Sequence, residues 1–593
     1  MFFKFQSRKE KIIKIKVVKR SLIWYNRYVE VILMFIKKVK NSKDNTNRLY
    51  LAESYRNKEG KPRHRLIKSY GVLEKLEEDN PNILEKLIAE AVRLTEEEAN
   101  TQTIKIDFTK LQEKSLLNYG YFVLEKIYND LEISSFVKNF ESQKRIKYSI
   151  DDVLRLLVYS RCLNPASKQG TYNHRLNYYN KFQSVKLKDM YKSLDHLHEM
   201  KDDLLLHVHH KIDKTRKRNC SLVFYDVTNY YFESDTLDGL RQKGVSKEKQ
   251  TTGIVQMGLF IDKDGIPITY KLFPGNTNDL STMKPILNKI KDKYNLGSIT
   301  VVADKGNNSG ENLAYIDDHE DYYIISQRIR GRKKELRDLV LNDLGYKHSQ
   351  DGTFKSKKIN RQREVKRSDG STYTINENLL CFWSLKEQIY QKNKRGNIEE
   401  RIEKFKTKPS LLNASNNFGV KKYFKTVNID TETGEIKKAK NQYLFDEEKY
   451  ERDTSLDGYY CIVTNNLELE AYDLIDNYRQ LSMIEDSFRV TKTDLEGRPV
   501  YVWTDEHIEA HFLTCFLALT IYRLLQLSLD NTYPIRQLKK ALNSAELIEL
   551  EQGIFKMNKT DDLFKTILKY NNLELDKSYY KEERFNSLLK SIK

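Results

Sequence analysis

Two aspartates stand where a strand would end, and both could hold a metal ion. Asp226 follows the apolar and aromatic run LVFY, and Asp304 follows VVA. An acid at the end of a buried strand is desolvated unless a cation meets it, so each is a candidate metal ligand. Phosphodiester cleavage needs such ligands, because two Mg²⁺ ions roughly 3.5–4 Å apart activate the nucleophile and neutralise the leaving oxygen. Ordinary turn chemistry after a strand stays open as the simpler interpretation.

Helical spacing indicates a third acid. Tyr478, Glu485 and Lys492 are separated by seven residues each, so they share one face of a helix predicted over 469–492. Arg489 falls close to that face. A glutamate flanked in this way can bind metal while its neighbours hold phosphate oxygens. The alternative is a solvated face on which Glu485 and Arg489 form an i,i+4 ion pair.

A mixed sheet must bring these acids together. The predicted strands are 221–226, 253–261, 266–273, 298–304 and 322–326, with a hairpin turn at 262–265 and a helix over 280–294. Three consecutive strands, then a helix, then a strand that ends in Asp is the order of an RNase H-like fold. The sequence therefore predicts an α/β protein with a mixed sheet flanked by helices.

The pattern breaks up between about 327 and 454. This segment opens with the positive run QRIRGRKK and continues with polar strands, loops and a charged helix over 398–405. A further strand over 458–465 then precedes the helix that carries Glu485. We therefore expect a β-rich insertion that interrupts the catalytic unit. Arg328 and Arg330 in the positive run are candidate DNA contacts, although a solvated loop is the alternative.

The remaining segments have simpler patterns. Strand-like runs at 48–56 and 64–71, joined by the turn NKEGKP, predict a small basic β unit, and helical spacing dominates from about 80 to 215. Residues 1–33 look unlike the rest, and Met34 is a second plausible start. The expected division is 1–33 atypical extension, 34–105 β unit plus helix, 106–215 helical DNA-binding and assembly region, 216–326 first part of the core, 327–454 insertion, 455–530 second part of the core, and 531–593 helical tail.

Composition favours a polyanionic partner. The 593 residues contain 103 Lys and Arg against 84 Asp and Glu, a formal net charge of +19, which suits counterion release from nucleic acid. Enrichment of Lys and Tyr by an AT-rich genome is the alternative. Five scattered cysteines without a CxxC pair argue against disulfides and thiolate zinc, and they fit a reducing cytoplasm. The apolar run 512–527 is short and contains Arg523, so we expect a core helix and no membrane span.

Two other motifs have ordinary explanations. Five histidines (His196, His198, His207, His209, His210) crowd a helical stretch where Glu199 and Asp203 could complete a zinc site, but a polar helix face also accounts for them. Asp262 and Asp264 resemble the start of a calcium loop. Gly265 comes too early for that loop, so a hairpin turn is expected.

Four strings resemble the DDE transposases of bacterial insertion sequences. They are YDVTNYYFES (225–234), GLFIDKDGIPITYKLFPGNTND (258–279), VVADKGNNSGENL (301–313) and YRQLSMIEDSFRVTKTDLEGRPVYVWTDEHIEAHF (478–512). More narrowly they resemble the subgroup with a β-rich insertion before the catalytic glutamate, and the segment 34–71 resembles openings in that subgroup. The resemblance covers most of 34–525.

The resemblance implies residue roles. Asp226, Asp304 and Glu485 match the metal-binding triad, expected to hold two Mg²⁺ ions with Mn²⁺ able to substitute. Tyr478 and Lys492 match the signature Tyr-x-x-Arg-x-x-x-Glu-x6-Lys, whose Tyr and Lys contact DNA phosphates. Leu481 occupies the signature Arg position. The missing charge could come from Arg479 or Arg489, and Trp503 could hold an unstacked base or belong to the core.

The resemblance also implies an activity. The family cuts DNA at terminal inverted repeats with metal-activated water, and the freed 3′-OH then attacks target DNA. It acts as a homodimer or larger multimer on synapsed ends. Two alternatives remain: an RNase H-like nuclease without strand transfer, and a catalytically weak DNA-binding derivative of a mobile element.

Overall fold

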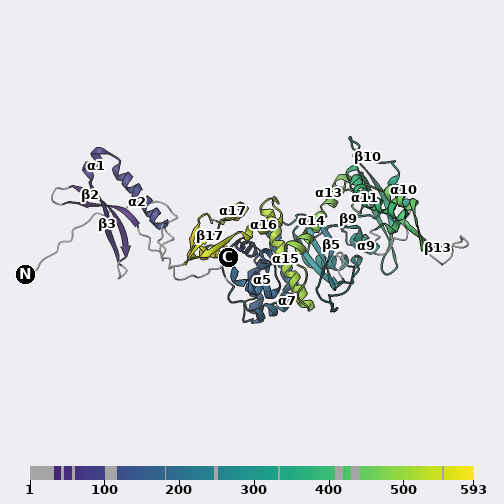
Figure 1. The fold of residues 1–593 in the computed structure, drawn as a ribbon, viewed down its shortest axis with the longest axis horizontal. Coiled ribbons are helices and arrows are strands. Elements are labelled where there is room, and N and C mark those ends of the chain that lie inside the picture. The colour runs from purple at the N-terminus through teal and green to yellow at the C-terminus, as the bar shows by residue number, and fades with distance from the viewer. Residues whose placement is uncertain are drawn as a thin grey trace, which may run out of the picture. The chain divides into compact units, whose positions relative to one another are not determined.

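The chain forms two compact units, Met1–Gln112 and Glu113–Lys593 (Figure 1). The computed structural model describes residues 33–41, 46–56, 61–100, 116–180, 182–245, 251–331, 334–407, 419–428, 441–550, 553–573 and 575–592. The extension expected at 1–33 therefore lies outside the described residues, apart from Leu33.

The N-terminal unit is a three-stranded antiparallel sheet covered by helices. Its elements are β1 (Leu33–Lys40), β2 (Asn47–Arg56), β3 (Pro62–Val72), α1 (Leu73–Asp79) and α2 (Ile83–Asn100), with strand order β1-β2-β3. Leu49, Leu73 and Leu87 form its small core. The predicted pair of strands is confirmed, and β1 adds a third because LMFIKKVK pairs with β2 along its whole length.

The second unit contains a nine-stranded mixed sheet with the RNase H strand order. The relevant elements are β5 (Leu222–Tyr231), β6 (Ile254–Asp262), β7 (Pro267–Pro274), α8 (Met283–Tyr294), β8 (Thr300–Ala303), α9 (Gly310–Asp318) and β9 (Tyr322–Ser326). Strands β5, β6 and β7 are antiparallel neighbours, whereas β8 and β9 run parallel to β5. The order β7-β6-β5-β8-β9 confirms the predicted fold class.

The insertion extends this same sheet. Its elements are α10 (Lys334–Leu341), β10 (Lys347–His348), β11 (Phe354–Lys366), β12 (Thr372–Ser384), α11 (Leu385–Thr407), β13 (Phe424–Asn428), β14 (Asn441–Phe445) and α12 (Glu447–Thr454). The predicted later strand, β15 (Tyr459–Thr464), lies between β9 and β12. The charged helix is longer than the predicted 398–405. Cys381 and Cys461 are opposite each other in β12 and β15, with their sulfurs 3.3 Å apart.

Helices lie on both faces of the sheet: α8 and α9 pack on one face, and a helical bundle packs on the other. The bundle includes α3 (Tyr121–Asp130), α4 (Ile133–Lys144), α5 (Ile150–Leu163), α6 (Lys168–Asn173), α7 (Leu187–Arg216) and α15 (Asp505–Ser528). Helix α15 is long and apolar enough to cross a membrane, but 89% of its most apolar window is buried inside the protein. It packs against α5 and α7, which confirms the predicted core helix.

The C-terminal segment differs from the expected helical tail. It contains α16 (Ile535–Asn543), β16 (Glu546–Glu549), β17 (Ile554–Met557), α17 (Asp562–Tyr570), β18 (Tyr579–Lys581) and α18 (Glu582–Ser591). The strands form a sheet of order β18-β17-β16-β4, in which β4 is Leu116–Asn118. The prediction of helices alone is wrong because these strands are short, and β16 finds its partner β4 more than four hundred residues away.

The single helix predicted over 469–492 is also wrong. The structure has α13 (Ala471–Arg479), α14 (Ser482–Arg489) and a π-helical turn, η6 (Val490–Asp494). Around Gln480 the backbone changes to i→i+3 hydrogen bonds, with Leu481 N donating to Tyr478 O and Met483 N donating to Gln480 O. This break allows the apolar side chains of both helices to face the core, Leu474 from α13 and Ile484 from α14.

Candidate active site

Asp226 and Asp304 lie side by side on neighbouring parallel strands. The β5–β8 register pairs Leu222 with Thr300 and ends with Tyr225 opposite Ala303, so the next two residues along are the two aspartates. Asp304 keeps an extended backbone, with φ −76° and ψ 165°. Adjacent strands are about 4.8 Å apart. Two carboxylates therefore meet at the end of β8.

Asp226 does not end its strand as predicted. β5 continues to Tyr231 because the residues after Asp226 pair with β6, from Val227 opposite Gly258 to Tyr231 opposite Ile254. The pairing of β5 with β8 does stop at Tyr225. Pairing with β6 therefore holds the backbone of Asp226 beyond the point where its pairing with β8 has ended.

Both aspartates project from the face of the sheet that α13 and α14 cover. Side chains alternate along a strand, so Asp226 shares a face with Phe224, and Asp304 shares one with Val302. Phe224 and Val302 belong to the same hydrophobic core as Ile484 of α14. The intervening residues, such as Tyr225, belong to the core on the opposite face.

Glu485 reaches this face from α14, which packs against β5 and β6. Its side chain is exposed. Tyr478 lies near both Glu485 and Asp304: burial raises the pKa of Tyr478 to about 12, and the carboxylates of Asp304 and Glu485 add to the effect. The Ser326 hydroxyl donates to Asp304 Oδ1 at 3.3 Å, and the backbone N–H of Lys305 donates to the same oxygen at 2.6 Å.

The donor chemistry suits a hard divalent cation, since all three side chains are carboxylates. Two carboxylates on neighbouring strands are of the type that such an ion prefers as ligands. Within the described ranges, however, no three His, Cys, Asp or Glu side chains form one closed metal-binding cluster. The structure therefore brings two of the predicted ligands together and places the third on the same face, outside the pair.

The basic side chains on this segment have different partners. Lys492 lies above the Tyr230 ring, with Nζ 5.4 Å from its centroid. Arg489 binds Asp486 and Asp494, at 2.8 and 3.0 Å, rather than the i,i+4 partner considered from the sequence. Arg479 is exposed.

The other predicted DNA contacts differ in exposure. Arg328 is exposed, whereas Arg330 forms an ion pair with Asp457 at 2.9 Å. Trp503 is half-exposed, and the guanidinium of Arg241 lies 5.1 Å from its ring centroid. Leu481, in the signature Arg position, is buried with 7% exposure.

The histidine and aspartate motifs have structural partners. His207 Nε2 lies 3.1 Å from Leu131 O, and His209 Nδ1 lies 3.3 Å from the Arg218 guanidinium. Asp262 forms a buried ion pair with Arg218 at 2.7 Å and accepts the backbone N–H of Ile266. The hairpin turn predicted at 262–265 is confirmed, with Gly265 at φ +79°.

Sequence reasoning missed Ser326, which orients Asp304, and two buried cations, Arg161 and Lys168, in a pocket described below. A weak signal for Ser326 is its place at the end of β9, because β9 runs parallel to β8, the strand that precedes Asp304. Lys168 has no local signal, since its neighbours in the fold come from a loop more than three hundred residues away.

The sheet order and the paired aspartates define a protein of the RNase H-like fold. The chain belongs to the DDE transposase family: a family model described as the transposase DDE domain matches residues 221–521, just over half of its 593 residues. A second model, the N-terminal domain of the IS1634 family transposases, matches 36–103. The protein is thus a transposase that acts on DNA, and its family generally uses divalent metal ions.

Other comparisons add little. No curated protein matches the chain. Among solved structures, a piggyBac transposase in a synaptic complex with hairpin DNA is similar with a TM-score of 0.32 and 8% identity, covering 81% of this chain and 88% of that one. A likeness at that level carries no argument about the site.

Proposed function

We propose that the protein binds the terminal inverted repeats of an insertion sequence, cleaves DNA at their ends and joins the freed ends to a target. The observation that carries this proposal is the register of β5 and β8, which sets Asp226 beside Asp304 on the face covered by α14. Family membership supplies the class of substrate.

Asp226, Asp304 and Glu485 would hold the divalent ions, two Mg²⁺ with Mn²⁺ able to substitute. Bound ions of this kind activate an oxygen nucleophile and neutralise charge on the leaving oxygen. Because Glu485 is exposed and outside the aspartate pair, its flexible side chain would close the set when DNA and metal arrive.

Residues around the carboxylates would hold the DNA. The phenol of Tyr478, with its pKa raised to about 12, stays protonated at neutral pH and can donate to a phosphate oxygen. Lys492, Arg479 and Arg489 supply positive charge, and Trp503 offers an exposed ring for a base.

Parts outside the core would recognise the transposon end. The first eight residues of β3 are exposed and include Arg63, Arg65 and Lys68. A basic strand of this kind can bind along the DNA backbone or in a groove. The helices before the core would help to pair two or more copies in a synaptic complex.

A pre-cut transposon end with a free 3′-OH tests the proposal against its main rival. Incubated with Mg²⁺ and a target plasmid, the protein should join the end to the plasmid, and the Asp226→Asn variant should not. Hydrolysis without joining would support a nuclease. The absence of both hydrolysis and joining would support a DNA-binding derivative. The ends to use are the inverted repeats sought just outside the reading frame.

A further inference from the structure

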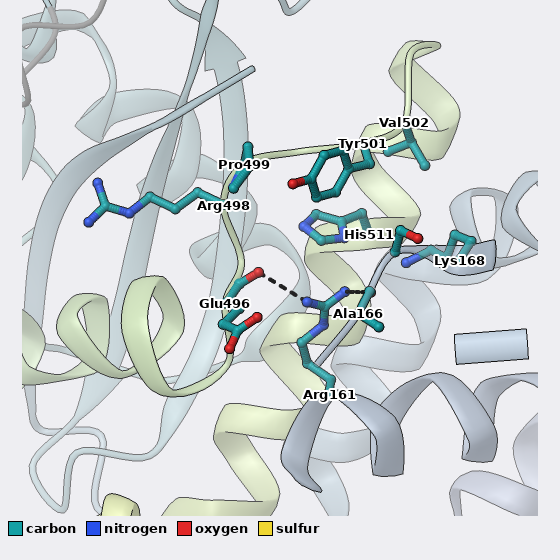
Figure 2. Close-up of a pocket in the computed structure, with 10 residues that line it drawn as sticks. Arg161, Ala166, Lys168, Glu496, Arg498, Pro499, Tyr501, Val502 and His511 are labelled. Atoms are coloured by element: carbon teal, nitrogen blue, oxygen red, sulfur yellow. Dashed lines mark hydrogen bonds between the residues drawn. The ribbon is translucent and has the colours of Figure 1, made fainter. Parts of the chain in front are cut away.

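A pocket of about 400 Å³ lies between α5, α6, the start of α15 and the loop that follows η6 (Figure 2). Its polar lining residues include Arg161, Lys168, Glu496, Arg498, Tyr501 and His511. Arg161 and Lys168 form a buried floor, with 6% and 5% exposure. Tyr501 and Glu496 on the rim are exposed.

Among the described residues, the hydrogen bonds of Arg161 all go to backbone carbonyl oxygens. One terminal nitrogen donates to the carbonyl oxygens of Leu495 and Glu496, at 3.1 and 3.0 Å, and the other donates to Ala166 O at 3.3 Å. Its Nε is buried and has no hydrogen-bond partner among the described residues. These bonds orient the guanidinium without neutralising it.

Lys168 is more unusual, because its ammonium has neither a hydrogen bond nor an ion pair within the part of the chain that is described. Burial, followed by the charge of Arg161, lowers the pKa of Lys168 to about 7. A buried lysine beside a guanidinium tends to lose its proton, and an anion bound between the two would keep Lys168 charged and offset the cost of burying Arg161.

The remaining walls do not supply that anion. His511 Nε2 lies 3.0 Å from Gly497 O, and burial together with Lys168 and Arg161 holds the pKa of His511 well below its ordinary value, so the imidazole is neutral. Burial also raises the pKa of the neighbouring Cys515 thiol. Glu496 is the one carboxylate of the lining, and it lies on the exposed rim.

We propose that this pocket binds a phosphate group, with Arg161 and Lys168 on its oxygens. A guanidinium fork and a lysine point charge are the usual protein ligands of phosphate. Tyr501 and Pro499, which also line the pocket, give an apolar wall for an attached sugar or base.

The position of the pocket points to a phosphate of the bound DNA strand, a source that rests on the proposed function. The loop is joined to β5 by the hydrogen bond from Val500 N to Tyr231 O, 3.1 Å. Tyr231 is five residues beyond Asp226 on that strand, roughly 16 Å away. This corresponds to about five base steps at 3.4 Å each. Lys492, above Tyr230, lies between the two sites.

The test uses the full chain, the Lys168→Met variant and a matched control, Lys271→Met, a half-buried lysine on β7. The first measurement is the rise in melting temperature caused by inorganic phosphate at constant ionic strength, since a ligand that binds only the native state stabilises it. The second is the salt dependence of binding to a short labelled duplex. Losing one phosphate contact should lower the slope of log K against log salt by about 0.9.

We expect the wild type and Lys271→Met to be stabilised by phosphate and Lys168→Met not to be, with the salt slope reduced in Lys168→Met alone. Loss of the phosphate effect with an unchanged slope would assign the pocket to a free phosphate compound. If Lys168→Met keeps both properties, the proposal is overturned. Lys168→Gln, which keeps a polar side chain at this position, repeats the test should Lys168→Met fail to fold. The phosphate measurement needs no cleavage, so it stands even if strand transfer is never seen.

Discussion

Asp304 continues the parallel register of β8 by one residue and so lies beside Asp226 of β5. Each aspartate is held differently: Asp226 by pairing with β6, and Asp304 by hydrogen bonds from Ser326 and the Lys305 backbone. Two carboxylates on separate, rigid supports keep their spacing without a cation, which is what a preorganised metal site requires.

Removing the charge of any one acid should abolish cleavage while DNA binding survives. Asp226→Asn, Asp304→Asn and Glu485→Gln keep side-chain shape but lose a metal ligand. The loss in Mg²⁺-dependent nicking should be at least about 100-fold, since even outer partners of metal ligands are worth 10–100-fold. Nicking of supercoiled DNA and anisotropy with a labelled duplex measure the two properties. A variant that still nicks with Mg²⁺ removes its residue from the triad.

Restoring the signature arginine should destabilise the protein. Leu481 is 7% exposed and packs in the main core, so Leu481→Arg buries a charge where an apolar side chain stood. We expect the free energy of unfolding to fall by about 3 kcal/mol or more, as measured by urea titration. Ser482→Arg, one residue along and exposed, is the control and should change little. Equal stability together with tighter end binding would show that position 481 can reach DNA.

Arg328 and Arg330 should behave differently on substitution. Arg328→Ala removes an exposed cation, so the salt slope of DNA binding should fall by about 0.9 with stability unchanged. Arg330→Ala breaks an ion pair with Asp457, which keeps Arg395 as a second partner, so we expect a loss of about 1 kcal/mol of stability and normal DNA binding. The reverse pattern would reassign the two residues.

Two buried histidines should make stability fall on mild acidification. Burial, then Arg218 and His210, lowers the pKa of His209 to about 3, and the pKa of His511 is also far below normal. The unfolded chain takes up a proton at each near pH 6.5 and the folded protein does not, so stability is constant above pH 7 and decreases below 6.5.

The slope should approach about 1.4 kcal/mol per pH unit for each histidine. Urea titrations between pH 7 and 5 measure it. His511→Gln can still donate to Gly497 O but does not titrate, so the slope should fall by the share of one histidine, about 1.4 kcal/mol per pH unit. An unchanged slope would mean that His511 is protonated in the folded protein.

Local patterns predicted most elements because strands and helices of the core have clear apolar periodicity. They also singled out the two aspartates, since each follows a run that becomes buried. What they missed depends on distant partners. β5 continues beyond Asp226 because its later residues pair with β6, and β16 forms a strand because it pairs with β4. The buried cations Arg161 and Lys168 lie against a loop more than three hundred residues away, so no local stretch of sequence includes both.

The helix break at Leu481 was not predicted for a different reason. Residues 469–492 have good helical spacing, and Tyr478, Glu485 and Lys492 would share a face of one straight helix. The core instead selects i→i+3 bonds around Gln480, and a π turn carries Lys492. Spacing alone therefore identified the segment but not the directions of its side chains.

The insertion strand β12 covers an edge that would otherwise be open. It pairs with β15 from Asn378 to Trp383, and β15 in turn pairs with β9. Excising 327–454 to make a minimal catalytic domain would leave β15 with unpaired backbone donors and acceptors. An exposed edge of this kind can pair with a strand of another molecule. Such a truncation should elute as aggregates in size-exclusion chromatography, whereas the full chain keeps β15 covered by β12 and, beyond it, β11.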